Sequence, residues 1–150
     1  MSWIILFIVS WIMFFIAVDF KMLKYTIWSG LLTALIEVSI DILYTGHKLY
    51  KTVNNVFETK GISIFFIFSV PIVIGTLMSQ YYPKKKLYRI LNIFIISILF
   101  YAVEFILVLK GDLIYINWIW IESLIIDLLT MMSISWFNLV VLNKWRESVP

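Results

Sequence analysis

The stretch "ALIEVSIDILY", residues 34–44, places two acidic side chains inside a run of apolar residues. Glu37 and Asp41 lie four positions apart, which is about one turn of an α-helix. The surrounding segment, 25–44, has the length and apolar character of a helix that crosses a membrane. Because a charged group is costly in hydrocarbon, this stretch predicts both a membrane location and a place where acidic side chains need partners.

The composition of the whole chain supports a membrane location. Of its 150 residues, 63% are hydrophobic and 14% are charged, whereas a soluble domain has about 45–50% apolar and about 25% charged residues. We therefore predict an integral membrane protein. The chain has no cysteine, which excludes disulfides, thiolate metal sites and cysteine nucleophiles.

Five apolar segments are candidate spans, and they cover residues 2–18, 25–44, 62–82, 87–109 and 113–142. The predicted fold is all-α, a single domain formed by a bundle of five transmembrane helices. The first segment lacks a basic start and a small-residue cleavage site, so we interpret it as a retained span. The last segment is long for one crossing and either tilts or begins at the interface in "YINWIWI". Pro71 and Gly75 predict a kink in the third segment.

The distribution of basic residues predicts the orientation, because cytoplasmic loops carry an excess of Lys and Arg. With five spans, one side carries eight basic residues: Lys21, Lys24, Lys84, Lys85, Lys86, Arg89, Lys144 and Arg146. The other side carries four: Lys48, Lys51, Lys60 and Lys110. This bias predicts an N-terminus outside the cell and a C-terminus in the cytoplasm.

Acidic residues occur within three of the predicted spans, and they are the candidate functional residues. They are Glu37 and Asp41 in the second span, Glu104 in the fourth, and Glu122 and Asp127 in the fifth. Helical rise and the predicted topology put all but Asp127 in the outer half of the membrane. We expect Glu37, Asp41, Glu104 and Glu122 to converge, with Tyr101 and Asp127 nearby. Side chains that share their helical faces are expected to support the site: Tyr44, Ser97, Tyr101 and Ser123.

Apart from Arg89, at the opposite end of the fourth segment from Glu104, no Lys or Arg lies within the spans to neutralise these acids. Carboxylates that are crowded together in a dry place repel one another, so some should carry a proton or share a cation. Two interpretations follow. The acids form a cation- or proton-binding pocket of a small transport or sensor component. Alternatively, they form a structural network in which protonated acids hold the helices together through hydrogen bonds.

Two further classes of function remain as alternatives. The first is a non-catalytic partner or immunity-type subunit that docks on another membrane protein. The second is a lipid-modifying enzyme that uses a protonated carboxylate. It is less favoured, because the chain has no G-x-S-x-G, H-E-x-x-H or Walker motif. We expect no cofactor and no nucleic-acid partner. The expected partners are the lipid bilayer and either another membrane protein or a second copy of the chain. His47, the single histidine, is expected in a solvated loop, and metal binding is left open.

Several stretches resemble a known family. They are "GTLMSQYYPKKK" after the third span, the glutamate late in the fourth, "KGDLIYINWIWIESL" at the start of the fifth, and the Glu37 and Asp41 pair. Together they are similar to a family of small, uncharacterised five-span membrane proteins of spore-forming, low-GC Gram-positive bacteria. Members of that family more often have a Trp-Tyr-Pro stretch after the acid of the second span, where this chain has "YTGHKLYKTVNN". The resemblance implies a bacterial cytoplasmic membrane and five spans, and it implies no activity.

Overall fold

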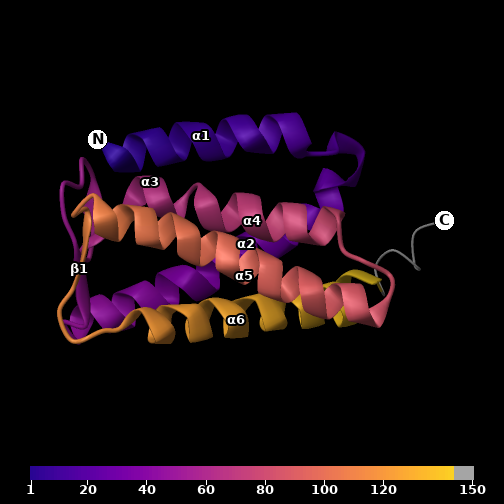
Figure 1. Cartoon of the computed structure of the whole chain (residues 1–150). Helices are drawn as coiled ribbons and strands as arrows, with labels where there is room; N and C mark the ends of the chain where they lie inside the picture. Colours follow the sequence, from indigo (N-terminus) through magenta and orange to yellow (C-terminus); the bar gives the residue numbers. More distant parts are fainter. Residues whose placement is uncertain (144–150) are drawn as a thin grey trace.

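The computed structural model describes residues 1–143 and is mostly helical (Figure 1). The helices are α1 (Ser2–Ala17), α2 (Phe20–Gly46), α3 (Ile64–Ile67), α4 (Val70–Gln80), α5 (Lys86–Leu109) and α6 (Trp120–Phe137), and a π-helix, η1 (Asn138–Leu142), continues α6. Four short strands lie in the connections: β1 (Tyr50–Thr52), β2 (Glu58–Thr59), β3 (Ile62–Ser63) and β4 (Leu113–Tyr115). The long helices run alternately in opposite directions, so the chain forms a helical bundle.

Three helices are long and apolar enough to cross a membrane: Phe20–Gly46, Lys86–Leu109 and Trp120–Leu142. The other two predicted spans are shorter. Helix α1 has 16 residues, which gives a length of about 24 Å against a hydrocarbon core of about 30 Å. The third predicted span is the apolar stretch Ile64–Gln80. The predicted helical bundle is therefore confirmed, while the structure supports three full-length candidate spans and not five.

The third predicted span is interrupted near its proline. Helix α3 ends at Ile67 and α4 begins at Val70, directly before Pro71. Proline is well tolerated in the first turn of a helix, where its missing N–H has no intrahelical partner. The Ser69 hydroxyl donates a hydrogen bond to the Phe65 carbonyl at 2.6 Å in the break. The predicted kink is thus a break just before Pro71.

Helices α2 and α4 form the closest helix pair in the bundle. A Cβ atom added to Gly30 of α2 would lie 2.5 Å from the Ile72 carbonyl oxygen, and one added to Gly75 of α4 would lie 2.7 Å from the Ser29 carbonyl oxygen. The side chains nearest to these two positions are the hydroxyls of Thr76 and Thr33. Small residues let helix backbones approach closely, which is the usual way that helices associate in lipid. Gly75 is therefore a packing position and not a kink.

The end of the bundle that carries the N-terminus is covered by the strands. β1 pairs with β4 in antiparallel register, and β2 pairs with β3. The prediction of one helical segment over 113–142 is wrong at its start, because residues 113–115 form β4 and the helix begins at Trp120. Pairing with β1 satisfies backbone groups of this stretch that a helix would otherwise satisfy internally.

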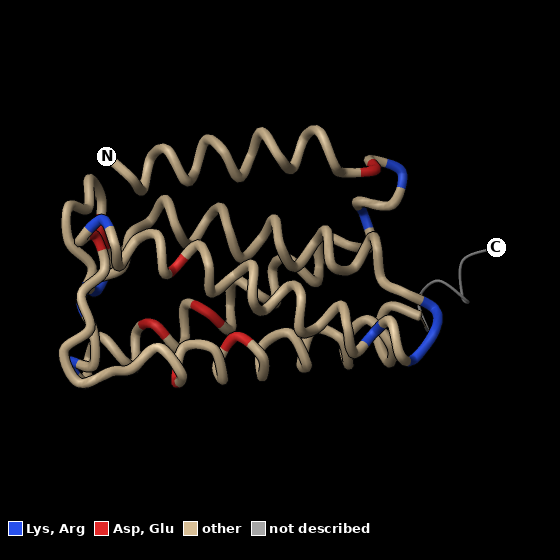
Figure 2. The backbone as a smooth tube through the Cα atoms, in the orientation of Figure 1, with Lys and Arg blue, Asp and Glu red and all other residues tan. Residues whose placement is uncertain are grey.

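Basic residues gather at the two ends of the bundle, and a group of acidic residues lies between them, nearer to the strand-covered end (Figure 2). The end opposite the strands includes the start of α2 with Lys21 and Lys24, and the start of α5 after Lys84 and Lys85. Two residues of the predicted basic excess, Lys144 and Arg146, lie outside the described residues. The partition of the remaining basic residues follows the one expected from the sequence.

Candidate functional site

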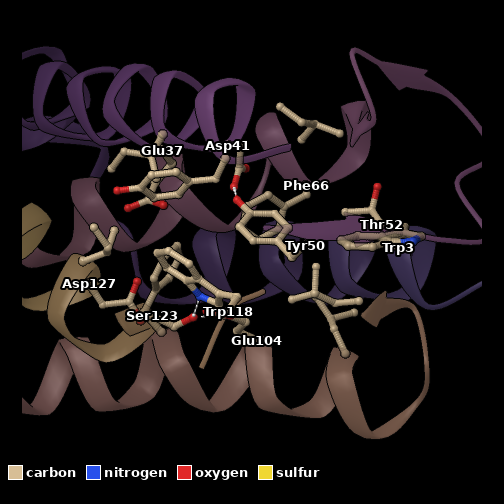
Figure 3. A pocket seen from close by; sticks show the side chains of 17 residues that line it. Trp3, Glu37, Asp41, Tyr50, Thr52, Phe66, Glu104, Trp118, Ser123 and Asp127 are labelled. Atoms are coloured by element: carbon tan, nitrogen blue, oxygen red, sulfur yellow. Dashed lines mark hydrogen bonds between the residues drawn. The ribbon is translucent and has the colours of Figure 1, made fainter. Parts of the chain in front are cut away.

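A cavity of about 70 Å³ lies between α2, α5 and α6, beneath the β1–β4 pair (Figure 3). Four carboxylates from these three helices line it: Glu37, Asp41, Glu104 and Asp127. Its walls are otherwise mainly apolar and aromatic, and include Trp3, Tyr44, Tyr50, Phe66, Phe100 and Trp118. By volume the cavity has room for a few water molecules, whereas pockets for small organic ligands usually measure about 300–1,000 Å³.

Helix periodicity explains how the acids reach one place. Glu37 and Asp41 are one turn apart on α2, so they share a face, and Ser123 and Asp127 do the same on α6. Glu37 and Asp127 are 6% and 3% exposed, and Asp41 and Glu104 are partly buried nearer the strands. All four carboxylates are close enough to interact electrostatically with one another.

Glu122 does not join this cluster, and the expectation that it converges with Glu37, Asp41 and Glu104 is wrong. Its side chain is exposed and accepts a hydrogen bond from the Ile119 backbone N–H at 2.9 Å. Glu122 therefore caps the first turn of α6. It is adjacent to Ser123 in the sequence, so it points about 100° away from the face that lines the cavity. Asp127, expected only nearby, takes its place.

Two tyrosines of the strand pair donate hydrogen bonds to acids of the cavity; Tyr50 lines the cavity itself, and Tyr115 lies in the neighbouring surface groove. Tyr50 of β1 and Tyr115 of β4 are direct partners in the antiparallel pair, so their side chains lie on the same face. The Tyr50 hydroxyl donates to Asp41 Oδ1 (Figure 3), and the Tyr115 hydroxyl donates to Glu104 Oε1. Burial, then the neighbouring Asp41 carboxylate, raises the pKa of Tyr50 above its ordinary value. Burial and the hydrogen bond to Glu104 do the same for the pKa of Tyr115. Both phenols therefore remain hydrogen-bond donors. We call β1 and β4 with these side chains the tyrosine lid.

Glu104 sits in a short chain of hydrogen bonds. The Ser123 hydroxyl donates to Glu104 Oε1 at 2.6 Å, and the Trp118 indole N–H donates to Ser123 Oγ at 2.7 Å. The Trp118 ring packs on Tyr44, with ring centroids 4.8 Å apart. The chain holds one carboxylate oxygen of Glu104 in place with neutral donors.

The remaining predicted supporting residues lie in different places. Tyr44 and Ser123 line the cavity. Ser97 is fully buried on α5, and its hydroxyl has no hydrogen-bond partner among the described residues. Tyr101 is half-buried and lines a separate surface groove with Phe105 and Tyr115, so it does not line the carboxylate cavity. His47 is exposed at the end of α2, as expected.

The electrostatics of the cavity are unbalanced. Of its 17 lining side chains, all within the described residues, none is Lys, Arg or His. Glu37 Oε1 and Asp127 Oδ2 are buried and lack a hydrogen-bond partner in the part of the chain that the structure describes. Four ionised carboxylates cannot coexist in such a place, because repulsion and desolvation act together against them. Within residues 1–143 no group of three Asp, Glu or His side chains is placed to hold a metal ion.

Sequence reasoning missed the lid. Tyr50 lies between the second and third predicted spans, and Tyr115 lies at the predicted start of the fifth. Neither three-residue strand carries a periodic pattern long enough to predict a strand. Only the pairing of two distant segments reveals that these hydroxyls meet the acids of the helices.

The fold and the site together define a class: a helical bundle with three candidate membrane-spanning helices within residues 1–143, and a carboxylate cavity whose acid Asp41 accepts a hydrogen bond from Tyr50 of the strand pair. Comparison of the chain with family models, with curated proteins and with solved structures finds no match.

Proposed function

We propose that this protein binds protons, or a small cation in their place, at the carboxylate cavity, as a component of transport or sensing in a membrane. The observation that carries the proposal is the meeting of four carboxylates from three helices in one cavity without a basic lining residue. Ionisable residues within membrane segments are rare and usually mark ion pathways or proton relays. A purely structural network would leave no carboxylate oxygen free, yet Glu37 and Asp127 each have one without a partner in residues 1–143.

The geometry favours protons over the alternatives. The donors in the cavity wall are neutral hydroxyls and an indole, which suit a carboxyl group that gains and loses a proton. A metal ion would need several oxygen ligands in a defined arrangement. A lipid-modifying enzyme would need a roomy apolar pocket beside an acid, and the cavity of about 70 Å³ is too small for a lipid.

We also propose that the chain crosses a bacterial cytoplasmic membrane five times with its N-terminus outside. Support comes from the alternating helix directions and from the basic residues at the end opposite the lid. The shorter helices α1 and α4 would span the membrane with the help of the residues that flank them, which extend to the interface, or of local thinning of the bilayer. Apolar side chains are exposed along α1 and α5, for example Ile12 and Ile98, and the bilayer is the partner that would cover them. The tyrosine lid would then face the outside.

Thermal unfolding tests the binding proposal. The melting temperature of the purified protein in detergent should change with pH, because the folded and unfolded states bind different numbers of protons. Replacing a cavity acid should weaken this pH dependence. We expect Glu37→Gln and Asp127→Asn each to reduce the change in melting temperature across the neutral pH range by about half.

Glu122→Gln is the matched control, because it removes an acid from the same helix as Asp127 while keeping an oxygen that can accept the Ile119 hydrogen bond. The control should melt with the wild-type pH dependence. Equal flattening in all three variants, or none in any, would remove the basis for proton binding at the cavity.

A further inference from the structure

A row of buried polar side chains continues from the cavity toward the opposite end of the bundle. On α2, Thr33, Ser29 and Thr26 follow Glu37 at helical spacing, and all three are fully buried. At 1.5 Å per residue, the stretch from Glu37 to Thr26 covers about 16 Å along the helix axis. Ser and Thr are common where helices pack closely in lipid, so the hydrogen-bond partners of this row decide whether it does more than pack.

Polar groups from the neighbouring helices face this row. The Ser29 hydroxyl donates to Asn138 Oδ1 at 2.8 Å, and Asn138 is the first residue of η1. The Thr76 hydroxyl of α4 lies against Gly30, and the Thr33 hydroxyl lies against Gly75. The Thr33 and Thr26 hydroxyls donate to the Ser29 and Met22 carbonyls of their own helix at 2.7 and 3.1 Å, so within the track they serve as acceptors. π-Helical turns are rare and often occur at functional sites. We call Thr26, Ser29, Thr33, Thr76, Ser79 and Asn138 the polar track.

Several atoms of the polar track lack a protein partner. Thr76 Oγ1, Ser79 Oγ and Asn138 Nδ2 are buried without a hydrogen bond to any of the residues from 1 to 143. Buried polar atoms are normally satisfied, and internal water is the common partner when protein groups do not serve. One water joins two polar atoms about 5.5 Å apart, and successive members of the α2 row are about 4.5–6 Å apart along the axis.

The track reaches the basic end of the bundle. The Gln80 side chain donates to Thr26 Oγ1 at 3.2 Å and to the Asp19 carbonyl at 3.0 Å, and it accepts from the Asp19 N–H at 2.9 Å. Asp19 precedes α2 at its exposed start. Beside the track, Met78, Met131 and Ile134 form an apolar cluster that is at most 1% exposed. This cluster is apolar and offers water no hydrogen-bond partner.

We propose that the polar track conducts protons between the carboxylate cavity and the basic end of the bundle, which makes the protein a proton-translocating protein. The inference rests on the proposed proton binding at the cavity. Hydroxyl groups and water both donate and accept hydrogen bonds, so a proton entering on one side releases another on the far side of each group. Glu37 is the junction, because it lines the cavity and stands one turn from Thr33 on the same face of α2. Asn138 is a positioning residue that orients the Ser29 hydroxyl.

Proton flux in liposomes tests the track. The full chain is reconstituted with a pH-sensitive dye inside, and a potassium gradient with valinomycin drives proton entry. We expect wild type to raise the initial rate well above that of protein-free liposomes. Thr33→Val, which removes the hydroxyl and keeps the shape, should lower the rate about tenfold, the effect of one lost hydrogen-bonded step. Thr33→Ser keeps the hydroxyl and should retain the wild-type rate.

Ser39→Ala is the matched control, because the Ser39 hydroxyl, like that of Thr33, donates to the carbonyl four residues earlier, but Ser39 is exposed and lies outside the polar track. It should leave the flux unchanged. If Thr33→Val does not fold, Ser29→Ala replaces it and should lower the rate in the same direction. Wild-type flux equal to that of empty liposomes, or hydroxyl-removing variants with full flux, would overturn the inference.

The two proposals fail separately. Absent flux together with a pH-dependent melting temperature that Glu37→Gln flattens would leave a proton-binding sensor and remove only the track. A melting temperature that does not respond to the cavity acids would remove the proposed function itself, whatever the flux.

Discussion

Each tyrosine–acid pair of the lid occupies one oxygen of a carboxyl group and leaves the other available. Tyr50 donates to Asp41 Oδ1, and Tyr115 shares Glu104 Oε1 with Ser123. A neutral donor stabilises an ionised carboxylate without cancelling its charge, unlike Lys or Arg. The acids near the lid are thus held in place while remaining able to exchange a proton, which a salt bridge would hinder.

Asp112 anchors the edge of the lid. Its carboxylate accepts a hydrogen bond from Asn54 Nδ2 at 2.9 Å, and its backbone carbonyl accepts from the Val53 N–H at 2.7 Å. Burial alone would raise the pKa of Asp112, but hydrogen bonds from Ser2 and Asn54 and the charge of Lys110 hold the pKa below its ordinary value. The ionised carboxylate therefore stabilises the folded protein.

We predict that this contribution to stability is present at neutral pH and is lost in acid. Because the pKa of Asp112 is lower in the folded protein than in the unfolded chain, the stabilisation is complete above the unfolded-state pKa and disappears as the pH falls through the folded-state pKa. Asp112→Asn should lower the free energy of unfolding at neutral pH by up to about 1 kcal/mol, as for one hydrogen bond near water. Denaturant unfolding at neutral and acidic pH measures the loss in free energy of unfolding and its disappearance in acid. Glu58→Gln, an exposed acid of the same loop region, is the control, and equal losses in the two variants would contradict the prediction.

Among single residues, the sequence predicted acids better than their partners. Glu37, Asp41, Glu104 and Asp127 stand out because each interrupts an apolar helix. The prediction for Glu122 was wrong, because an acid in the first turn of a helix can cap the helix and needs no buried partner. Nothing in the local sequence distinguishes Tyr50 and Tyr115 from the other tyrosines of the chain.

At the scale of elements, the pairing of α2 with α4 gives the bundle its tightest contact. The two glycines lie opposite hydroxyl-bearing residues and a carbonyl of the partner helix. Without hydrophobic driving force inside a bilayer, such close approach supplies dispersion and weak polar contacts. This packing also aligns Thr33 and Thr76, on which the polar track depends.

We predict that Gly75→Ala destabilises the bundle by about 1–3 kcal/mol, the usual cost of overpacking. The added Cβ would lie 2.7 Å from the Ser29 carbonyl oxygen, and backbone atoms cannot move aside as a flexible side chain would. Gly46→Ala is the control, because a Cβ at Gly46 has nothing within 4 Å. Thermal or denaturant unfolding in detergent compares the two variants. A Gly75 variant as stable as the Gly46 variant would show that α2 and α4 are not closely packed.

The apolar runs of the sequence predicted that the long helices exist, but they predicted the residues at which the helices begin and end less well. The break before Pro71 follows from the proline. The late start of α6 does not follow from composition, because residues 113–119 are as apolar as a helix, yet residues 113–115 pair with β1 as a strand. Pairing with a distant segment overrides local preference here.

At the scale of the whole molecule, three features depend on one another: the helix directions, the basic ends and the convergence of the acids. The helical faces predict which acids can point into the bundle, and the predicted topology places these acids at similar depth in the membrane. The strand pair that closes the cavity joins segments from opposite halves of the chain, so no local signal reports it. The account therefore depends on the shared cavity more than on any single residue.

Infrared spectroscopy of the reconstituted protein at neutral pH tests this shared cavity most directly, because protonated side-chain carboxyl groups have their own carbonyl stretching band. Four acids without a basic lining residue cannot all be ionised, so wild type should show the band. The band should weaken in Glu37→Gln and in Asp127→Asn and persist in Glu122→Gln. A neutral-pH spectrum without protonated carboxyl groups, or a band that none of the cavity substitutions changes, would contradict the account.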